Sequence, residues 1–300
     1  MVATILRNIV KSILVLLPAD APAYLYTHLF KPRLLRLGVN MLLCKMIPAF
    51  IVLPEGKLAL NHEDPVVSGA LMLGAYEPFF AHEWRKAITP NMTIVDIGAN
   101  IGYYTIIASA HVKEGRVIAY EPEPVNVSFL KQSIAFNNCT NITLIESGLG
   151  DTDESRDLYL DSDNKGKHTL LPGEQKGAVK IRIPLTTLDH SLDTLGITRV
   201  DLIKMDIEGW EVKALRGMRE TLRRDHPILF FEYAPNRIRE TGEDPLLIFE
   251  TLRQEGYDFA VINEKTKCLE PLPRPDKLSL TLRGPDAYIN IYARVASETP

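Results

Sequence analysis

A short glycine-containing turn at residues 98–102 constrains the fold of this chain more than any other feature. The segment before it, Thr93 to Ile97, alternates and carries β-branched residues, which is typical of a strand. Gly98 and Gly102 then mark the turn into a helical segment at 103–111. Glycine is needed where the backbone takes positive φ or must approach another group closely. A strand, a glycine turn and a helix in this order predict one unit of a parallel α/β sheet.

An acid completes this pattern. The next apolar strand ends in Glu121, at the place where an acid binds ribose hydroxyls in this sheet topology. The dinucleotide pattern G-x-G-x-x-G is absent, as is the phosphate loop G-x-x-x-x-G-K-[ST]. Asp96 is placed to orient the turn and to meet an amino-acid group, and the helix start offers free N–H groups. Together these features favour S-adenosylmethionine (SAM) over a dinucleotide.

Six stretches between residues 66 and 293 resemble the FkbM-type SAM-dependent methyltransferase family. They are Gly74-Ala75-Tyr76-Glu77, VDIGANIGYYT at 95–105, YEPEPVN at 120–126, GLGD at 148–151, TTLD at 186–189 and DLIKMDIEGWE at 201–211. The resemblance implies methyl transfer to an oxygen, often a hydroxyl of a sugar or another natural product. It also implies a Rossmann-like class I methyltransferase fold.

We therefore predict an α/β fold with a seven-stranded, mostly parallel sheet, an antiparallel last strand and an N-terminal helical extension. The extension covers residues 1–65 and the methyltransferase domain covers 66–300. Strands are expected at 93–97, 116–120, 142–146, 200–205, 228–233, 258–262 and 287–292, with two more at 156–160 and 179–184 in a polar excursion. Helices are expected at 24–50 with breaks at Pro32 and Pro48, and at 66–73, 78–88, 103–111, 125–137, 210–223 and 245–255.

The motifs also predict the cofactor-binding residues. They are Glu77, Asp96, Gly98, Ala99, Asn100, Gly102, Tyr104, Thr105, Glu121, Pro122 and Asp151. Glu77 either reaches the amino group of SAM or forms a salt bridge that docks the N-terminal helices. Asp151 either accepts a hydrogen bond from the adenine amino group or is an ordinary turn acid. Asn126 is interpreted as a helix-start residue.

The acidic catalytic candidates lie at the carboxyl ends of the core strands at 200–205 and 228–233, where ligands bind in such sheets. Asp206 is the predicted general base, and the alternative is that it only orients Lys204 or its loop. Glu208 and Glu232 are expected to hold the acceptor hydroxyl or to share a hard cation such as Mg²⁺. The spacing of these acids along the chain does not by itself support a divalent metal, so metal assistance stays open.

Two basic side chains are further candidates. Lys204 lies among apolar residues in a strand, and a buried lysine is costly unless it is paired. We expect it to pair with Asp206 or Glu232, or to contact the acceptor. His168 lies in the polar excursion at 151–177 and is interpreted either as a base or donor to the acceptor or as an exposed loop residue.

Charge is distributed unevenly along the chain, whose net charge is −4. Against Asp20 alone, residues 1–50 carry Arg7, Lys11, Lys31, Arg33, Arg36 and Lys45. The remaining body is acidic, which argues against nucleic-acid binding. Base methylation is also disfavoured because the segment 206–209 lacks an Asn/Asp-Pro-Pro-aromatic element.

The three cysteines form no C-x-x-C pair, which favours a reducing cytoplasm.

The basic N-terminal segment has two open interpretations. Residues 5–17 are apolar apart from a few polar insertions, but the uninterrupted run is too short to span a bilayer, which needs about 20 residues. Residues 1–50 either touch an anionic membrane surface or pack on the core or on a second subunit of a homo-oligomer. We expect a cytoplasmic enzyme, peripheral at the membrane in the first case, with a small-molecule, glycan or lipid-linked acceptor. The alternative is a methyltransferase fold retained as a binding or membrane-associated scaffold module without turnover.

Overall fold

The computed structural model describes residues 33–160, 168–170, 179–282, 284 and 287–295. Within these residues, eight strands form the main sheet in the order β12-β11-β13-β10-β9-β3-β4-β5. The parallel part consists of β3 (Thr93–Ile97), β4 (Arg116–Tyr120), β5 (Ile142–Ile145), β9 (Leu202–Met205) and β10 (Ile228–Tyr233). The last strand, β13 (Ile289–Val295), is antiparallel and lies between β10 and β11 (Tyr257–Asn263). The predicted Rossmann-like class I architecture is confirmed.

The sheet has one strand more than predicted. After β11 the chain turns and forms β12 (Cys268–Pro271), which pairs antiparallel with β11 at the edge of the sheet. A short helix, α13 (Pro275–Thr281), follows before the chain returns as β13. The two final core strands are therefore antiparallel neighbours as expected, but their connection is longer than that of a simple hairpin.

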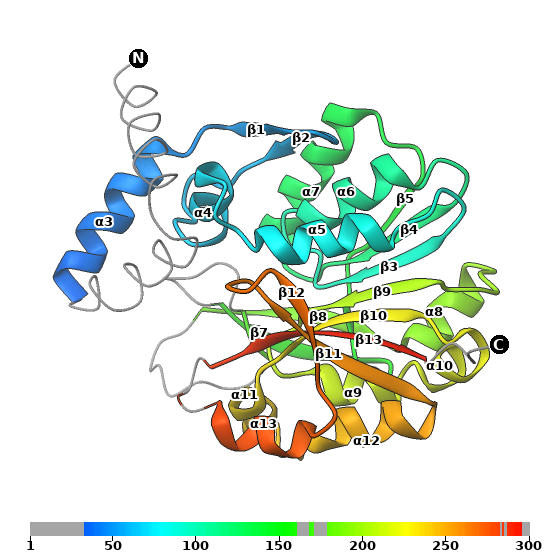
Figure 1. Ribbon diagram of the computed structural model, residues 1–300. Coiled ribbons are helices and arrows are strands. Elements are labelled where there is room, and N and C mark those ends of the chain that lie inside the picture. The colour runs from blue at the N-terminus through cyan, green and yellow to red at the C-terminus, as the bar shows by residue number, and fades with distance from the viewer. Residues whose placement is uncertain (1–32, 161–167, 171–178, 283, 285–286, 296–300) are drawn as a thin grey trace.

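Helices cover both faces of the main sheet (Figure 1). One face carries α5 (Pro78–Ala87), α6 (Tyr103–His111) and α7 (Pro124–Asn137), and the other carries α9 (Glu211–Arg216) and α12 (Leu246–Gln254). Successive strand residues point to opposite faces. Ile94 accordingly packs with Phe80 and Trp84, whereas Val95 packs in the core on the α12 side. Both faces are buried, as a parallel sheet requires.

The segment predicted as one helix at 210–223 is two helices, and this is a correction. α9 ends before Gly217, and α10 (Arg219–Asp225) starts two residues later. A Cβ atom on Gly217 would lie 2.0 Å from the carbonyl oxygen of Gly150. The Gly217 carbonyl accepts a hydrogen bond from the N–H of Asp189 (3.0 Å), at α8 (Leu188–Thr194). The spacing of apolar residues predicts one continuous helix, but tertiary contacts at Gly217 divide it into two.

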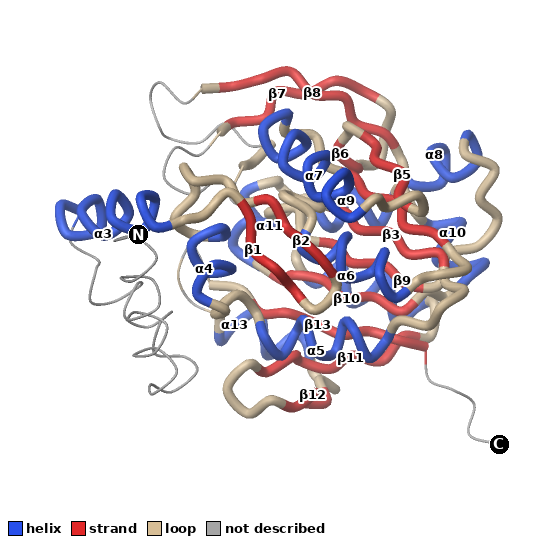
Figure 2. Tube along the Cα trace, turned by 90° about the horizontal axis from the view of Figure 1, so that it is seen from above, coloured by secondary structure: helices blue, strands red, loops and turns tan. Residues whose placement is uncertain are grey.

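The N-terminal part contains a hairpin that the sequence did not predict. α3 (Arg33–Met46) is followed by β1 (Phe50–Leu53) and β2 (Gly56–Ala59), and then by α4 (Val67–Leu73). The hairpin lies against α7: the N–H of Lys57 donates to Asn137 Oδ1 (2.7 Å), and the N–H of Ala59 donates to Ser133 Oγ (3.0 Å). α3 projects from the body in both views (Figures 1 and 2). The apolar segment at 5–17 and the part of the predicted helical region before residue 33 lie outside the described residues.

A smaller sheet lies beside the main one and is formed by β6 (Gly148–Leu149), β7 (Glu154–Tyr159) and β8 (Lys180–Thr186). The two strands predicted in the polar excursion are β7 and β8, and they pair antiparallel. Leu158, Ile183 and Leu185 form the apolar core of this sheet.

In the described part of the chain, no helix is both long and apolar enough to cross a membrane.

Candidate active site

A cleft lies where the carboxyl ends of β3, β4 and β9 meet the smaller sheet. In a parallel sheet these ends share one edge, which is where ligands bind. The cleft is lined by Ile97, Gly98, Asn100, Tyr120, Glu121, Pro122, Asn126, Gly148, Leu149, Leu158, His168, Leu170, Ile183, Asp206, Ile207, Glu208 and Trp210. Some predicted cofactor residues and some predicted catalytic residues therefore line the same cleft. They are Gly98, Asn100, Glu121 and Pro122 from the first set and His168, Asp206 and Glu208 from the second.

The turn between β3 and α6 requires glycine at two positions, because neighbouring residues leave no room for a side chain there. Gly98 has a φ of 73°, and a Cβ atom at this position would lie 2.0 Å from the carbonyl oxygen of Asp206. Gly102 has a φ of 96°, and its Cβ would lie 2.4 Å from Leu130 Cδ1. The turn is thus pressed against the loop after β9. This contact brings the predicted general base next to the predicted cofactor turn.

Glu121 is buried at the end of β4 and its carboxylate is oriented by two backbone N–H groups. Oε2 accepts from the N–H of Asn100 (2.8 Å), and Oε1 accepts from the N–H of Glu123 (3.0 Å). The side-chain amide of Asn126 lies 3.4 Å from Oε1. Burial raises the pKa of Glu121 to about 7. Asn126, interpreted from the sequence as a helix-start residue, lies in the first turn of α7 and also lines the cleft.

Asp96 lies behind the turn and is not among the described residues that line the cleft. It is fully buried, accepts a hydrogen bond from the Thr105 hydroxyl (2.5 Å) and lies 3.5 Å from Lys204 Nζ. Lys204 donates to the Gly98 carbonyl (3.1 Å) and lies 3.9 Å from Asp206 Oδ2. The pKa of Lys204 is raised: burial, the largest influence, lowers it, but the charges of Asp96, Asp206 and Glu77 outweigh burial.

Glu77 belongs to a polar group beside this lysine. It has a φ of 40°, and its carboxylate accepts from the Tyr104 hydroxyl (2.7 Å) and from the Asn290 side-chain amide (2.6 Å). Burial raises its pKa, and the hydrogen bond from Tyr104 opposes that shift. The structure thus ties Glu77 to α6 and β13. Its predicted contact with the SAM amino group stays a prediction.

Asp151, the predicted adenine contact, lies after β6 and 3.9 Å from Arg216 Nη1. It is not among the described residues that line the cleft, whereas its neighbours Gly148 and Leu149 are. The contact between Asp151 and adenine stays a prediction.

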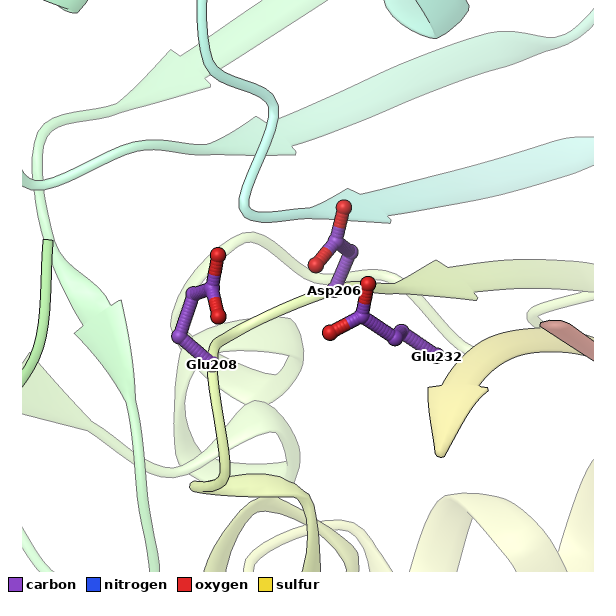
Figure 3. Close-up of side chains that lie close together, drawn as sticks. All are labelled: Asp206, Glu208 and Glu232. Atoms are coloured by element: carbon purple, nitrogen blue, oxygen red, sulfur yellow. The ribbon is translucent and has the colours of Figure 1, made fainter. Parts of the chain in front are cut away.

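Three carboxylates that are separated in the sequence come together at the cleft (Figure 3). One oxygen each of Asp206, Glu208 and Glu232 lies within 4.8 Å of the others, so these residues could hold a metal ion. Asp206 and Glu208 come from the loop after β9, and Glu232 comes from β10. The sequence placed the acids at the ends of two strands, and the structure shows that their side chains converge.

Two further residues, to which the sequence assigned no role, contact this acidic group or its loop. Arg237, in α11 (Pro235–Glu240), contacts Glu208 through Nη1 and lies 3.9 Å from Glu232 Oε1. Glu211 is buried and accepts from the N–H groups of Ile207 (3.2 Å) and Gly209 (3.3 Å). Burial raises the pKa of Glu211 to about 7. The sequence signal for Arg237 is its position just after β10, at the same sheet edge as Asp206.

The smaller sheet supplies the opposite wall of the cleft. Leu158, Leu170 and Ile183 are apolar lining residues, and the predicted candidate His168 lies beside them in the lining. Trp210 also lines the cleft, and the cationic groups of Arg156 and Lys213 each lie 5.1 Å from the centroid of its ring. Its indole Nε1 is buried and has no hydrogen-bond partner among the described residues.

Comparison with known proteins identifies the family. Residues 96–259, more than half of the chain, match the model of the methyltransferase FkbM domain. The chain belongs to the FkbM methyltransferase family. It is 28% identical to methyltransferase sdnD of Sordaria araneosa over 216 residues, which cover 61% of this chain and 80% of that protein.

Two further similarities cover smaller shares of the other proteins. The AMB antimetabolite synthetase AmbE of Pseudomonas aeruginosa is 22% identical over 244 residues, covering 69% of this chain but 10% of AmbE. The crystal structure of an FkbM methyltransferase from Methylobacillus flagellatus aligns with a TM-score of 0.45 and 18% identity. That alignment covers 88% of this chain and 60% of that one.

The cleft of this FkbM-family methyltransferase fits SAM. Glu121 offers a carboxylate for the ribose hydroxyls, and Pro122, Leu149 and Ile207 offer apolar surface for a planar base. The buried indole N–H of Trp210, which has no partner among the described residues, offers a hydrogen-bond donor in the same lining. An acceptor carboxylate, an N–H donor and apolar surface in one lining suit a nucleoside ligand.

Proposed function

We propose that this protein transfers the methyl group of SAM to a hydroxyl oxygen of a glycan, a lipid-linked sugar or a natural product. The position of Asp206 carries this proposal. Its side chain is 30% exposed, lines the cleft and lies beyond β9, against the glycine turn that starts the cofactor surface. A carboxylate at this place can accept the proton that an attacking hydroxyl must lose.

The reaction needs alignment and removal of one proton. Bound SAM supplies a methyl carbon on a sulfonium, so the acceptor oxygen forms the new C–O bond while the C–S bond breaks and leaves a neutral thioether. Asp206 takes the hydroxyl proton, and Glu208 and Glu232 hold neighbouring acceptor hydroxyls. Lys204 holds the Gly98 carbonyl, which keeps the turn and the base in register. Alignment of this kind supplies much of a rate enhancement.

The walls of the cleft support an acceptor with both polar and apolar parts. The carboxylates suit hydroxyl groups, and Leu158, Leu170 and Ile183 suit an apolar body. The partial similarity to an antimetabolite synthetase supports a natural-product acceptor. A bare sugar would leave the apolar wall without a partner, so we rank lipid-linked and natural-product acceptors first.

The test begins with isothermal titration of the protein with SAM, with NAD as the negative control. We expect micromolar SAM binding and no heat from NAD. Mixtures of lipid-linked sugars, polyketides and free glycans are then incubated with SAM carrying a labelled methyl group, and the methylated atom is located by NMR. Methylation of nitrogen or carbon would overturn the O-directed proposal. SAM binding without turnover on any acceptor class would favour the scaffold alternative.

We also propose that residues 1–50 place the enzyme at the cytoplasmic surface of an anionic membrane. The exposed face of α3 carries Leu35, Leu37, Met41 and Leu42, whose side chains are between 47% and 59% exposed. The segment 1–50 is basic although the chain as a whole is acidic. Apolar surface together with basic charge suits an interfacial helix on anionic lipid. Packing against a second copy of the chain is the competing explanation.

A further inference from the structure

Arg237 lies beside two of the three clustered carboxylates, Glu208 and Glu232. Its Nη1 contacts Glu208 Oε2 and lies 3.9 Å from Glu232 Oε1. The side chains of Arg237 and Glu208 are 13% exposed and that of Glu232 is 11% exposed, so water screens these charges poorly. The guanidinium therefore interacts with both carboxylates at short range.

The backbone places Arg237 there. α11 begins at Pro235, immediately after the strand that carries Glu232. The loop after β9 touches the helix, because a Cβ atom on Gly209 would lie 2.9 Å from the carbonyl carbon and the Cβ of Arg237. Glu208 precedes this glycine with a φ of 56°, which turns its side chain back toward the helix. The loop after β9, β10 and α11 thus hold Glu208, Glu232 and Arg237 next to one another.

The charge balance of the cluster requires a cation. Asp206, Glu208 and Glu232 have carboxylate oxygens within 4.8 Å of one another, and like charges at this distance repel strongly in a partly buried site. Lys204 lies 3.9 Å from Asp206 but also serves the buried Asp96 at 3.5 Å. A divalent ion is one way to satisfy such a carboxylate set. A forked guanidinium, which can bridge two carboxylates, is another.

We propose that Arg237 is the resident cation of this cluster, and that it occupies the space between Glu208 and Glu232 that a divalent ion would otherwise fill. Arg237 positions the two glutamates to receive acceptor hydroxyls and leaves Asp206 to take the proton. The positioning role rests on the proposed O-methyl transfer. The occupancy of the cluster by Arg237 does not, because it can be measured without turnover.

The first experiment titrates Mn²⁺ alone into the full-length protein, followed by electron paramagnetic resonance. We compare wild type with Arg237→Ala, Arg237→Gln and the control Arg239→Ala. Arg239 lies two residues further on the same helix, is exposed and binds Asn236 (2.8 Å). We expect Arg237→Ala and Arg237→Gln to gain one Mn²⁺ site at least about tenfold tighter than any in wild type or Arg239→Ala. When Glu208→Gln is combined with Arg237→Ala, the Mn²⁺ site gained by the single variant should be lost.

Wild-type protein that binds Mn²⁺ as tightly as the Arg237 variants would overturn the proposal, as would folded variants that gain no site. Circular dichroism of each variant establishes folding. A Mn²⁺ site in wild-type protein that Glu208→Gln alone removes would overturn the proposal even if both Arg237 substitutions unfold the chain. Once an acceptor is known, millimolar guanidinium should restore methylation by Arg237→Ala at least about tenfold, and sodium chloride should not. A merely structural arginine would not respond in this way. Absence of turnover in wild type would refute the proposed function and leave the Mn²⁺ result standing.

Discussion

The ammonium group of Lys204 donates a hydrogen bond to the carbonyl oxygen of Gly98 over 3.1 Å. This contact joins the central strand β9 to the glycine turn after β3. Lys204 is almost completely buried, and it also lies within 4 Å of carboxylate oxygens of Asp96 and Asp206. The lysine that interrupts an apolar strand in the sequence thus links the glycine turn to the loop that carries Asp206.

The first prediction concerns Glu121 and pH. The prediction that Glu121 binds the ribose of SAM requires its ionised carboxylate to accept from the ribose hydroxyls, and burial raises the pKa of Glu121 to about 7. SAM affinity should therefore increase as pH rises from 6 to 8. Glu121→Ala should weaken SAM binding by about 1.5–3 kcal/mol at pH 8, the usual value for a hydrogen bond to a charged group. Calorimetric titrations at several pH values measure both effects.

Glu121→Gln is the matched control for this pH dependence. It keeps the size of the side chain and removes its titration, so its SAM affinity should be flat across the same pH range. An unchanged affinity in Glu121→Ala would exclude Glu121 from the ribose site.

The second prediction concerns Asp206. Asp206→Asn should leave SAM affinity nearly unchanged and lower kcat by about 10²–10⁴-fold, because the amide keeps the shape of the loop but cannot accept the proton. Single-turnover rates and SAM titrations on the same preparation separate the two effects. Turnover that survives the substitution would show that Asp206 is not the base.

The third prediction compares two glycines with the same backbone conformation. Gly98 and Gly74 both have a φ of 73°, but a Cβ on Gly98 would meet Asp206 whereas a Cβ on Gly74 would meet nothing within 4 Å. Gly74→Ala should cost only the conformational strain, about 1 kcal/mol. Gly98→Ala should cost several kcal/mol more and weaken SAM binding, because the β9 loop must move. Urea unfolding and SAM titration test this, and equal effects of the two substitutions would contradict the proposed contact.

The fourth prediction concerns the stability of the fold. Burial raises the pKa of Glu121 and of Glu211 from an ordinary 4.5 to about 7. Between these values the folded state binds more protons than the unfolded state, so stability should fall as pH rises from about 4.5 to about 7. Glu211→Gln should reduce this slope in urea titrations at several pH values. A slope identical to that of wild type would show that Glu211 does not titrate in this range.

The fifth prediction tests the exposed face of α3. Replacing Leu37, Met41 and Leu42 with serine should abolish sedimentation with phosphatidylserine vesicles, which should also weaken with salt. Val179 is 66% exposed and lies in the smaller sheet region, so Val179→Ser is the control and should bind vesicles like wild type. Unchanged vesicle binding, or a change of oligomeric state in light scattering, would favour the packing explanation.

The sequence by itself determined the core of the fold and much of the cofactor surface. β3, the glycine turn and α6 are local features. The alternation of β3 and the positive φ of Gly98 and Gly102 depend on residues adjacent in the sequence. Glu121 was predictable for the same reason, since its place follows from the end of β4. Asp206, Glu208 and Glu232 were predictable as residues at strand ends.

Tertiary structure decided how these residues meet. The convergence of Glu232 on Asp206 depends on the register between β10 and β9, and Arg237 enters the cluster because Gly209 lets the loop touch α11. Gly217 ends α9 because Gly150 packs against it, and the β1–β2 hairpin lies on α7 through Ser133 and Asn137. Each of these contacts joins segments distant in the chain, and their energies depend on separations that local sequence patterns do not encode.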